Sequence, residues 1–324
     1  MKRLTLVLAS LVTLLFLVTP VAQAAFPERN ITLIVTFSPG GGFDTIARAI
    51  ARSMKKYLPK GVSVIVKNVT GAGGVTGTVF VYRAKPDGYT IGHIYADGML
   101  GLQMLKGVKK AGYDIHKFTW LALVGGESYG LLLRKDSPYR SVKDLQRAKR
   151  VTWGVEGVGV TRWFPAFIAA KELGIPFEVV AGYRGTGESL PALLRGDYDV
   201  FTQPIDHPSI VPYLKTGEIR PLVHLSETRA KNAPGVPTAK EVGYDLVVKL
   251  SRAIGAPPGV PADRAKILED LLLKAMADAD YKKFVAKSGI ALVPGNARKA
   301  KKDLEGFATL YGKYKSDMLR AIGK

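Results

Sequence analysis

The sequence contains no cysteine. A disulfide, a thiolate metal site and a cysteine nucleophile are therefore excluded. Histidine is also scarce, and the four histidines, at positions 93, 116, 207 and 224, show no spacing typical of metal ligands. We therefore expect no metal site and no cofactor, and we expect the fold to be held together by packing alone.

Long apolar runs are missing after residue 25, so no later segment is expected to cross a membrane. The one extended run covers residues 4–18, which is shorter than the about 20 residues that a spanning helix needs. Lys2 and Arg3 precede it, and the small-x-small pattern Ala22-Gln23-Ala24 follows. This pattern predicts a signal peptide over residues 1–25 and a periplasmic mature chain that begins at Ala25 or Phe26.

Acidic residues are few, with 27 Asp and Glu against 47 Lys and Arg and a net charge of +20. Without Lys2 and Arg3 the mature chain carries 45 basic residues and a charge of +18. Nucleic acid is a common partner of basic chains, but the predicted export separates this protein from it. Steering of an anionic small molecule, or attraction to anionic lipid, fits an exported protein better.

Strand, glycine-rich turn and helix follow one another repeatedly along the chain. Apolar residues 31–37 lead into a glycine turn at residues 38–42, and residues 62–66 lead into another at 71–74. Two more such turns, at residues 154–159 and 183–187, lie in the second half. The alternation predicts an α/β protein with a mostly parallel sheet covered on both faces.

Two apolar stretches predict crossings between two lobes. Residues 120–134 are apolar on both sides of Gly125 and Gly126, which suits a strand that leaves one lobe and enters the next. Residues 247–256 are interpreted as the return crossing. We therefore predict a first lobe of residues 26–125 and 250–324 and a second lobe of residues 126–249.

The glycine turns suggest an anion site. The first N–H groups of a helix lack intrahelical partners and lie at the positive end of its dipole, so an anion there is stabilised. For any one turn, a purely structural role in a tight loop is about as good an explanation. The occurrence of two turns in each lobe favours a carboxylate held in a cleft between the lobes.

Nucleotide phosphate fits the turns poorly. A phosphate-binding loop needs Gly-Lys-Ser or Gly-Lys-Thr, whereas Gly42 is followed by Phe43 and Asp44, and an acid opposes phosphate. The dinucleotide pattern also fails, because Thr76 and Arg162 occupy the positions of the third glycine. These departures argue against a nucleotide cofactor.

The order of motifs resembles that of the substrate-binding proteins of tripartite tricarboxylate transporters, the Bug receptors. The matching segments span nearly the whole chain after the signal and include residues 26–31, 37–44, 68–77, 86–90, 183–185, 222–229, 234–238, 241–243 and 256–261. The resemblance implies a two-lobed periplasmic binding protein (type II-like) that closes on di- or tricarboxylates, acidic amino acids or aromatic acids. It also implies delivery to a two-subunit membrane permease. We expect a monomer.

The resemblance also assigns ligand-binding residues. In such receptors, backbone groups of the first glycine loop and bridging waters hold the carboxylate. This carries over to Ser38, Gly40, Gly41, Gly42, Phe43 and Asp44, to Ala72, Gly73 and Gly74 in the second loop, and to Thr161, Tyr183, Gly185 and Asp206 in the second lobe.

Particular positions carry further expectations. Gly41 is expected to allow close approach or a positive φ. Phe43 departs from the small or hydroxyl residue usual at its position, which predicts a narrower or more apolar pocket and leaves the ligand open. For Asp206 a turn or cap role is an equally good explanation.

One motif favours an enzyme. The residues Gly126-Glu127-Ser128-Tyr129-Gly130 match the nucleophile elbow of α/β hydrolases, with Asp206 and His224 following in the required order. That elbow needs a strand, a sharp turn and a helix, whereas residues 131–133 continue as a strand. We therefore expect a non-enzymatic receptor, with a secreted hydrolase using Ser128 as a minor alternative. A ligand sensor for a signalling partner is a further alternative.

Overall fold

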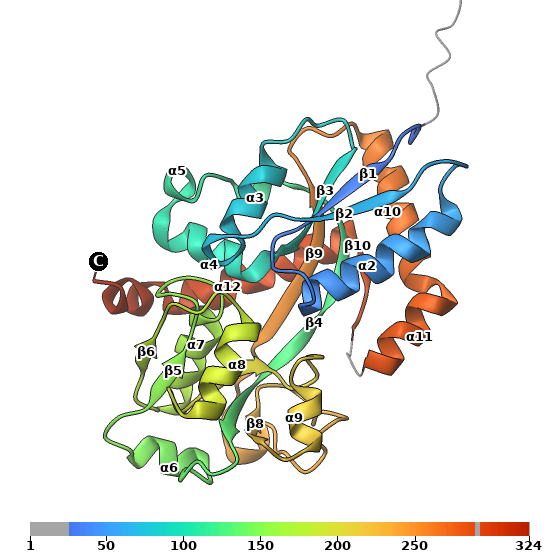
Figure 1. Cartoon of the computed structure of the whole chain (residues 1–324). Coiled ribbons are helices and arrows are strands. Elements are labelled where there is room, and N and C mark those ends of the chain that lie inside the picture. Colours follow the sequence, from blue (N-terminus) through green and yellow to red (C-terminus); the bar gives the residue numbers. More distant parts are fainter. Residues whose placement is uncertain (1–25, 289–291, 324) are drawn as a thin grey trace, which may run out of the picture.

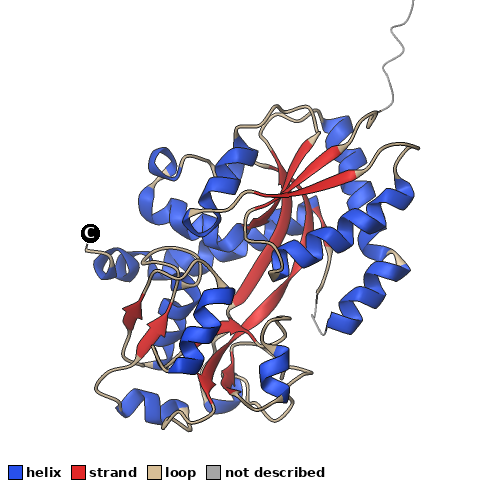
Figure 2. Ribbon diagram, viewed as in Figure 1, coloured by secondary structure: helices blue, strands red, loops and turns tan. Residues whose placement is uncertain are grey.

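The computed structural model describes residues 26–288 and 292–323 and shows two lobes joined by extended strands (Figure 1). The predicted signal peptide lies outside the described residues. None of the helices in the described ranges is long and apolar enough to cross a membrane. Strands form the centre of the first lobe, and helices cover them (Figure 2).

The main sheet runs in the order β10 (Gly295–Asn296), β4 (Thr119–Arg134), β9 (Lys249–Ala256), β3 (Thr90–Tyr95), β1 (Ile31–Val35) and β2 (Val64–Asn68). β1 pairs in parallel with β2 and β3, while β9 is antiparallel to β3 and β4. The prediction of a mostly parallel sheet is therefore wrong. A chain that leaves a lobe and later returns to it runs in opposite directions on its two crossings, so β4 and β9 are antiparallel.

Helices with apolar stripes enclose this sheet. They are α2 (Gly42–Met54), α3 (Val75–Tyr82), α4 (Ala96–Lys106), α5 (Val108–Ala111), α10 (Ala262–Ala277), α11 (Ala279–Ser288) and α12 (Ala297–Ala321). In α2, the buried residues Ile46, Ile50 and Met54 recur every four positions, so one face of the helix packs on the core. Both α10 and α11 pack against α2. These contacts, with those between α2 and β1, hold α2 against the core of the first lobe.

The second lobe is smaller. The far half of β4 pairs with β7 (Phe201–Pro204) and β8 (Ile219–His224), and β5 (Thr152–Gly154) pairs in parallel with β6 (Glu178–Val180). Its helices are α6 (Val142–Arg147), α7 (Trp163–Leu173), α8 (Thr186–Arg195) and α9 (Val211–Lys215). Short 3-10 turns complete the chain at Lys55–Tyr57, Ala72–Gly74, Ile115–Lys117 and Lys240–Val242.

The crossing strands β4 and β9 connect the lobes. They pair from Thr119 with Ala256 to Ser128 with Lys249, and beyond that point β4 belongs to the second lobe. The predicted lobe boundaries, at residues 125–126 and 249–250, fall within β4 and at the start of β9. Any relative motion of the lobes must therefore bend these two strands.

A second contact joins the lobes through the C-terminal helix α12, which runs between them in Figure 1. The ring of Phe164 in α7 stacks on that of Tyr311 in α12, with centroids 5.4 Å apart. On the other side, a Cβ added at Gly101 of α4 would lie 2.8 Å from the Phe164 ring. Tyr314 donates to Glu172 at 2.6 Å across the same interface. Phe164 therefore fills a close-packed space between the lobes.

Replacing Phe164 with alanine is expected to lower the free energy of unfolding by about 3–5 kcal/mol, because the change opens a cavity in this interface. Urea unfolding of the purified mature protein measures the change. Phe80→Ala is the matched control, because Phe80 is 51% exposed and its loss opens no cavity. Equal effects of the two substitutions would contradict this packing.

Candidate ligand-binding site

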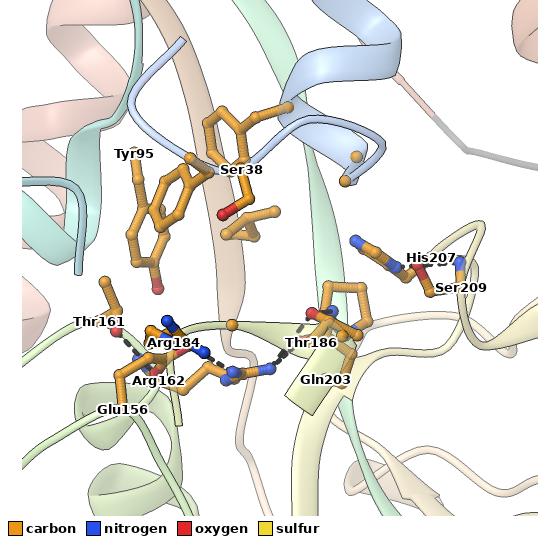
Figure 3. Close-up of a pocket in the computed structure, with 18 of the residues that line it drawn as sticks. Ser38, Tyr95, Glu156, Thr161, Arg162, Arg184, Thr186, Gln203, His207 and Ser209 are labelled. Carbon is orange, nitrogen blue, oxygen red and sulfur yellow. Dashed lines mark hydrogen bonds and ion pairs between the residues drawn. The ribbon is translucent and has the colours of Figure 1, made fainter. Parts of the chain in front are cut away.

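A cavity of about 480 Å³ lies between the two lobes. The loop after β1, the end of β3 and both crossing strands form one side, whereas the turn before α7, the start of α8 and the end of β7 form the other. Figure 3 shows that the polar side chains of Arg162, Thr186 and Gln203 gather on the second-lobe side. The cavity is thus built jointly by segments that are distant in sequence.

Seven of the thirteen predicted site residues line this cavity, and six do not. Those that line it are Ser38, Gly40, Gly41, Gly42, Phe43, Thr161 and Gly185. Those that do not are Asp44, Ala72, Gly73, Gly74, Tyr183 and Asp206. The structure therefore places the first glycine loop and the starts of α7 and α8 together, as ligand contact requires.

Asp44 is buried beneath the first glycine loop and holds its shape. Its carboxylate accepts hydrogen bonds from the N–H of Gly40 at 2.9 Å, from Arg48 Nε at 2.9 Å and from Asn68 Nδ2 at 3.0 Å. Burial alone would raise the pKa of Asp44, but Arg48, the Gly40 N–H and Asn68 outweigh it and lower the pKa. Asp44 therefore positions the loop and makes no contact with the cavity.

The second glycine loop lies behind the cavity wall. A Cβ added at Gly73 would lie 2.5 Å from Val160 Cγ1 and 3.2 Å from Thr161 Cγ2, so the loop packs directly against the turn that precedes α7. Thr161 lines the cavity, and Ala72, Gly73 and Gly74 do not. The positive φ of 65° at Gly73 and the close approach explain why glycine is required there.

Two predicted residues of the second lobe point elsewhere. The ring of Tyr183 packs against Tyr198, with centroids 5.6 Å apart. Asp206 accepts a hydrogen bond from Asn232 Nδ2 at 3.0 Å. The residue after it, His207, lines the cavity in its place.

The first glycine loop presents the start of α2 to the cavity. Gly41 is the N-cap and makes no side-chain cap, so the N–H groups of Gly42, Phe43 and Asp44 have no intrahelical partner. The positive φ belongs to Gly40, at 79°, whereas Gly41 has an ordinary extended conformation with φ of −76°. The expected positive φ at Gly41 is therefore wrong, whereas close approach of a ligand to Gly41, which lines the cavity, stays a prediction. Close approach requires glycine at position 42, where an added Cβ would lie 2.9 Å from His207 Nε2.

Sequence reasoning missed Arg162, which is buried in the second-lobe wall. Its guanidinium forms an ion pair with Glu156 and donates to Thr186 Oγ1 at 3.3 Å, Gln203 Oε1 at 3.3 Å and Ser189 Oγ at 3.0 Å. These bonds use both terminal nitrogens, so Arg162 organises the wall. A basic residue that closely follows a glycine turn containing a single acid, Glu156, is the signal that could have identified it.

Arg252 and Glu127 form a buried ion pair between the crossing strands β9 and β4. Arg252 lines the cavity and its guanidinium lies 4.9 Å from the centre of the Phe43 ring. Burial raises the pKa of Glu127, and the nearby Arg252 opposes that rise. Both residues stand in segments that the sequence identifies as crossing strands, and neither was assigned a binding role, so their mutual contact was not predicted.

Two histidines lie near the loop in fixed, neutral states. Burial, with the charges of Arg252 and Arg162, lowers the pKa of His207 to about 3. Burial and Arg252 likewise lower the pKa of His93 to about 3, and its Nδ1 donates to the Phe43 carbonyl at 3.0 Å. Among the residues that the structure describes, no group of His, Asp and Glu could hold a metal ion.

Ser128 does not have the geometry of a nucleophile elbow. It lies within β4 and pairs with Lys249 of β9. A hydrolase elbow places the serine on a sharp turn between a strand and a helix, and β4 continues as a strand to Arg134. The sequence match to that motif is therefore accidental.

A family model for the tripartite tricarboxylate transporter family receptor matches residues 46–307. The chain belongs to this family. A Cupriavidus necator relative, the UPF0065 protein in the gbd 5' region, is 31% identical over 82% of this chain and 80% of its own. Among solved structures, the periplasmic binding protein BugD is 25% identical, with a TM-score of 0.76 over 89% of this chain and 98% of BugD. MatC from Rhodopseudomonas palustris, solved with bound malate, is 27% identical, with a TM-score of 0.74 over 91% and 99%.

These similarities confirm the family and the two-lobed binding-protein fold that the sequence motifs predicted. The receptor is a solute-binding protein of a family whose members are periplasmic. The individual contacts assigned by resemblance stay predictions.

The Asp44 network predicts a pH-dependent stability difference between the wild type and Asp44→Asn. Because the folded-state pKa lies below the unfolded value of about 3.9, the carboxylate stabilises the fold above that value, and the benefit is lost as pH falls through the folded pKa. Near pH 7 the substitution should cost about 1.5–3 kcal/mol. Urea unfolding of the wild type and of Asp44→Asn at a series of pH values measures the difference in their free energies of unfolding. A difference that persists unchanged at the lowest pH would contradict the network.

Proposed function

We propose that this receptor captures a small organic carboxylate in the cavity between its lobes and delivers it to the two-subunit membrane permease of a tripartite tricarboxylate transporter. The observation that carries the proposal is the start of α2, whose free N–H groups open into a cavity that both lobes enclose. Such a helix start stabilises an anion. The malate bound to MatC, a relative of the same fold, supports a carboxylate as that anion.

The second lobe supplies matching donors on the opposite side. The start of α8 carries no side-chain cap, and Gly185, Thr186 and Gly187 line the cavity. Thr186 Oγ1 accepts from Arg162 and from Gln203 Nε2, so its own proton is available to a ligand. A ligand with acceptor groups at both ends would therefore contact both lobes. Such bridging favours closure around the ligand.

We further propose that the ligand leaves chemically unchanged. Ser128 lies within a strand, and the buried histidines His93 and His207 have pKa values that hold them neutral at pH 7. Ser128 is thus not presented on an elbow, and a pKa of about 3 makes His93 and His207 weak general bases at pH 7. Delivery to a permease is the role that the family description supports.

Thermal-shift screening of the mature protein tests the carboxylate proposal. At one hundred times the dissociation constant, a ligand stabilises the folded state by about 2.7 kcal/mol, which raises the melting temperature by a few degrees. Malate, citrate, adipate, glutamate and benzoate form the test set, with glucose and ATP as comparison ligands. Stabilisation by glucose or ATP alone would contradict the proposal.

Substitutions at Gly42 and Gly41 test whether the first loop is the site. A methyl group at Gly42 would lie 2.9 Å from His207 Nε2 and 3.3 Å from Arg252 Nη2, so Gly42→Ala should weaken carboxylate binding at least about tenfold. At Gly41 the added methyl would meet only the Ser38 carbonyl, at 3.5 Å, so Gly41→Ala should weaken binding less. Calorimetry with the carboxylate that stabilises the protein most in the screen measures the affinity of each variant. Equal affinities of the two variants would argue against contact at position 42.

A further inference from the structure

Two buried side chains aim unused donors at Gly42. Arg252 is 1% exposed, and its Nη2 has no hydrogen-bond partner in the described part of the chain. His207 is 6% exposed, and its Nε2 likewise has no partner within residues 26–288 and 292–323. These two nitrogens are the atoms nearest to a Cβ added at Gly42. They therefore converge on the uncapped start of α2.

The direction of the Arg252 donor is fixed by its surroundings. Glu127 binds Nη1 on one side, and the Phe43 ring lies against the guanidinium. Because the guanidinium is planar and rigid, fixing Nη1 also fixes Nη2. Glu127 does not line the cavity, so the ligand would meet the free nitrogen and not the carboxylate.

The His207 donor is fixed in the same way. Its Nδ1 accepts a hydrogen bond from the N–H of Ser209 at 3.2 Å. In a neutral imidazole the other nitrogen then carries the proton, so Nε2 is a donor. His207 follows β7 in the second lobe, whereas α2 belongs to the first lobe. One anion could therefore accept hydrogen bonds from both lobes at this point.

We propose that Arg252, His207 and the first N–H groups of α2 form a subsite for one ionised carboxylate of the ligand. This inference rests on the proposed carboxylate function and adds the two side chains that select the group. All three donors lack an acceptor partner, so a carboxylate, which only accepts, satisfies them. An amide in the same place has one accepting oxygen, and its NH2 group would face donors where the second carboxylate oxygen would accept. The subsite therefore selects acids over their amides.

The aromatic walls beside the subsite indicate what kind of group is attached to the ligand carboxylate. The rings of Phe37 and Phe43 lie 4.8 Å apart, and Tyr95 lies 6.3 Å and 6.2 Å from them. All three line the cavity, together with Leu250. An aliphatic chain or ring next to the carboxylate would bury its surface here. The structure thus assigns carboxylates with an apolar segment beside the acid group as the ligand class.

Imidazole NMR of the ¹⁵N-labelled mature protein gives a direct readout, because the chain has only four histidines. The probes are adipate, hexanoate and benzoate, each compared with its amide. At least one acid should shift the His207 signals, and this shift should saturate at the same acid concentration as the rise in melting temperature. The amides should leave the His207 signals in place. The exposed His116 is the control, and His116→Gln assigns its signals.

Substitutions then test each donor. His207→Leu should weaken binding of the responding acid at least about tenfold, whereas His207→Gln, which keeps a donor at that reach, should retain most of the affinity. Arg252→Lys keeps a cation beside Glu127 but loses the second arm of the fork, so it should also weaken binding about tenfold. His207→Gln keeps the polarity and approximate size of the side chain, so it supplies a folded variant if Arg252→Lys does not fold.

The outcomes separate this inference from the proposed function. If malate or glutamate binds but none of the three acids moves the His207 signals, the subsite and its ligand class are wrong and the carboxylate receptor stands. If an acid binds with equal affinity to the wild type, His207→Leu and Arg252→Lys, the subsite is also wrong. If no carboxylate in the thermal screen binds, both proposals fail.

Discussion

The rest of the site depends on the buried ion pair between Arg252 and Glu127. A buried pair gains little stability, because the cost of removing two charges from water offsets their attraction. Its effect here is geometric. The pair ties β9 to β4 at the crossing between the lobes, aims one guanidinium nitrogen at the first glycine loop and places a cation over Phe43. The loop, held from below by Asp44, and the guanidinium thus meet in one fixed arrangement.

In the proposed site, an anion would be recognised without a large local charge. Each arginine that lines it has an acidic partner, since Arg162 pairs with Glu156, Arg184 with Glu188 and Arg252 with Glu127. Attraction inside the cavity therefore comes from oriented N–H groups, which need no reorganisation when a carboxylate arrives. The mature chain is predicted to carry a charge of +18, and few of its basic residues line the cavity. A basic surface raises the encounter rate with anions without deciding which anion fits.

Local patterns predicted the first loop well, and non-local contacts explain what was missed. The run of strand, glycines and apolar helix positions around residues 31–54 contains its own structural signals, so the start of α2 followed from the sequence. Arg252 gave no such signal, because its role depends on β9 lying beside β4. The sequence predicted Asp206 as a site residue, whereas His207 lines the cavity. The polar turn after β7 does not by itself determine which of these two neighbouring side chains faces the cavity. The strand directions failed for the same reason, since the crossings are set by the path of the whole chain.

Closure follows from where the unused donors lie. The start of α2 belongs to the first lobe, His207 to the second, and Arg252 to the strand that joins them. Without an acceptor between them, bringing these groups together leaves buried donors unsatisfied, which costs free energy. A carboxylate satisfies all three at once only when the lobes are close. Under the proposed function, a carboxylate would therefore bind a closed form more tightly than an open form, and this difference in affinity would shift the population toward closure. The contact of α7 with α12 lies outside the cavity, so the proposed closure would have to keep or rearrange this packed interface as β4 and β9 bend.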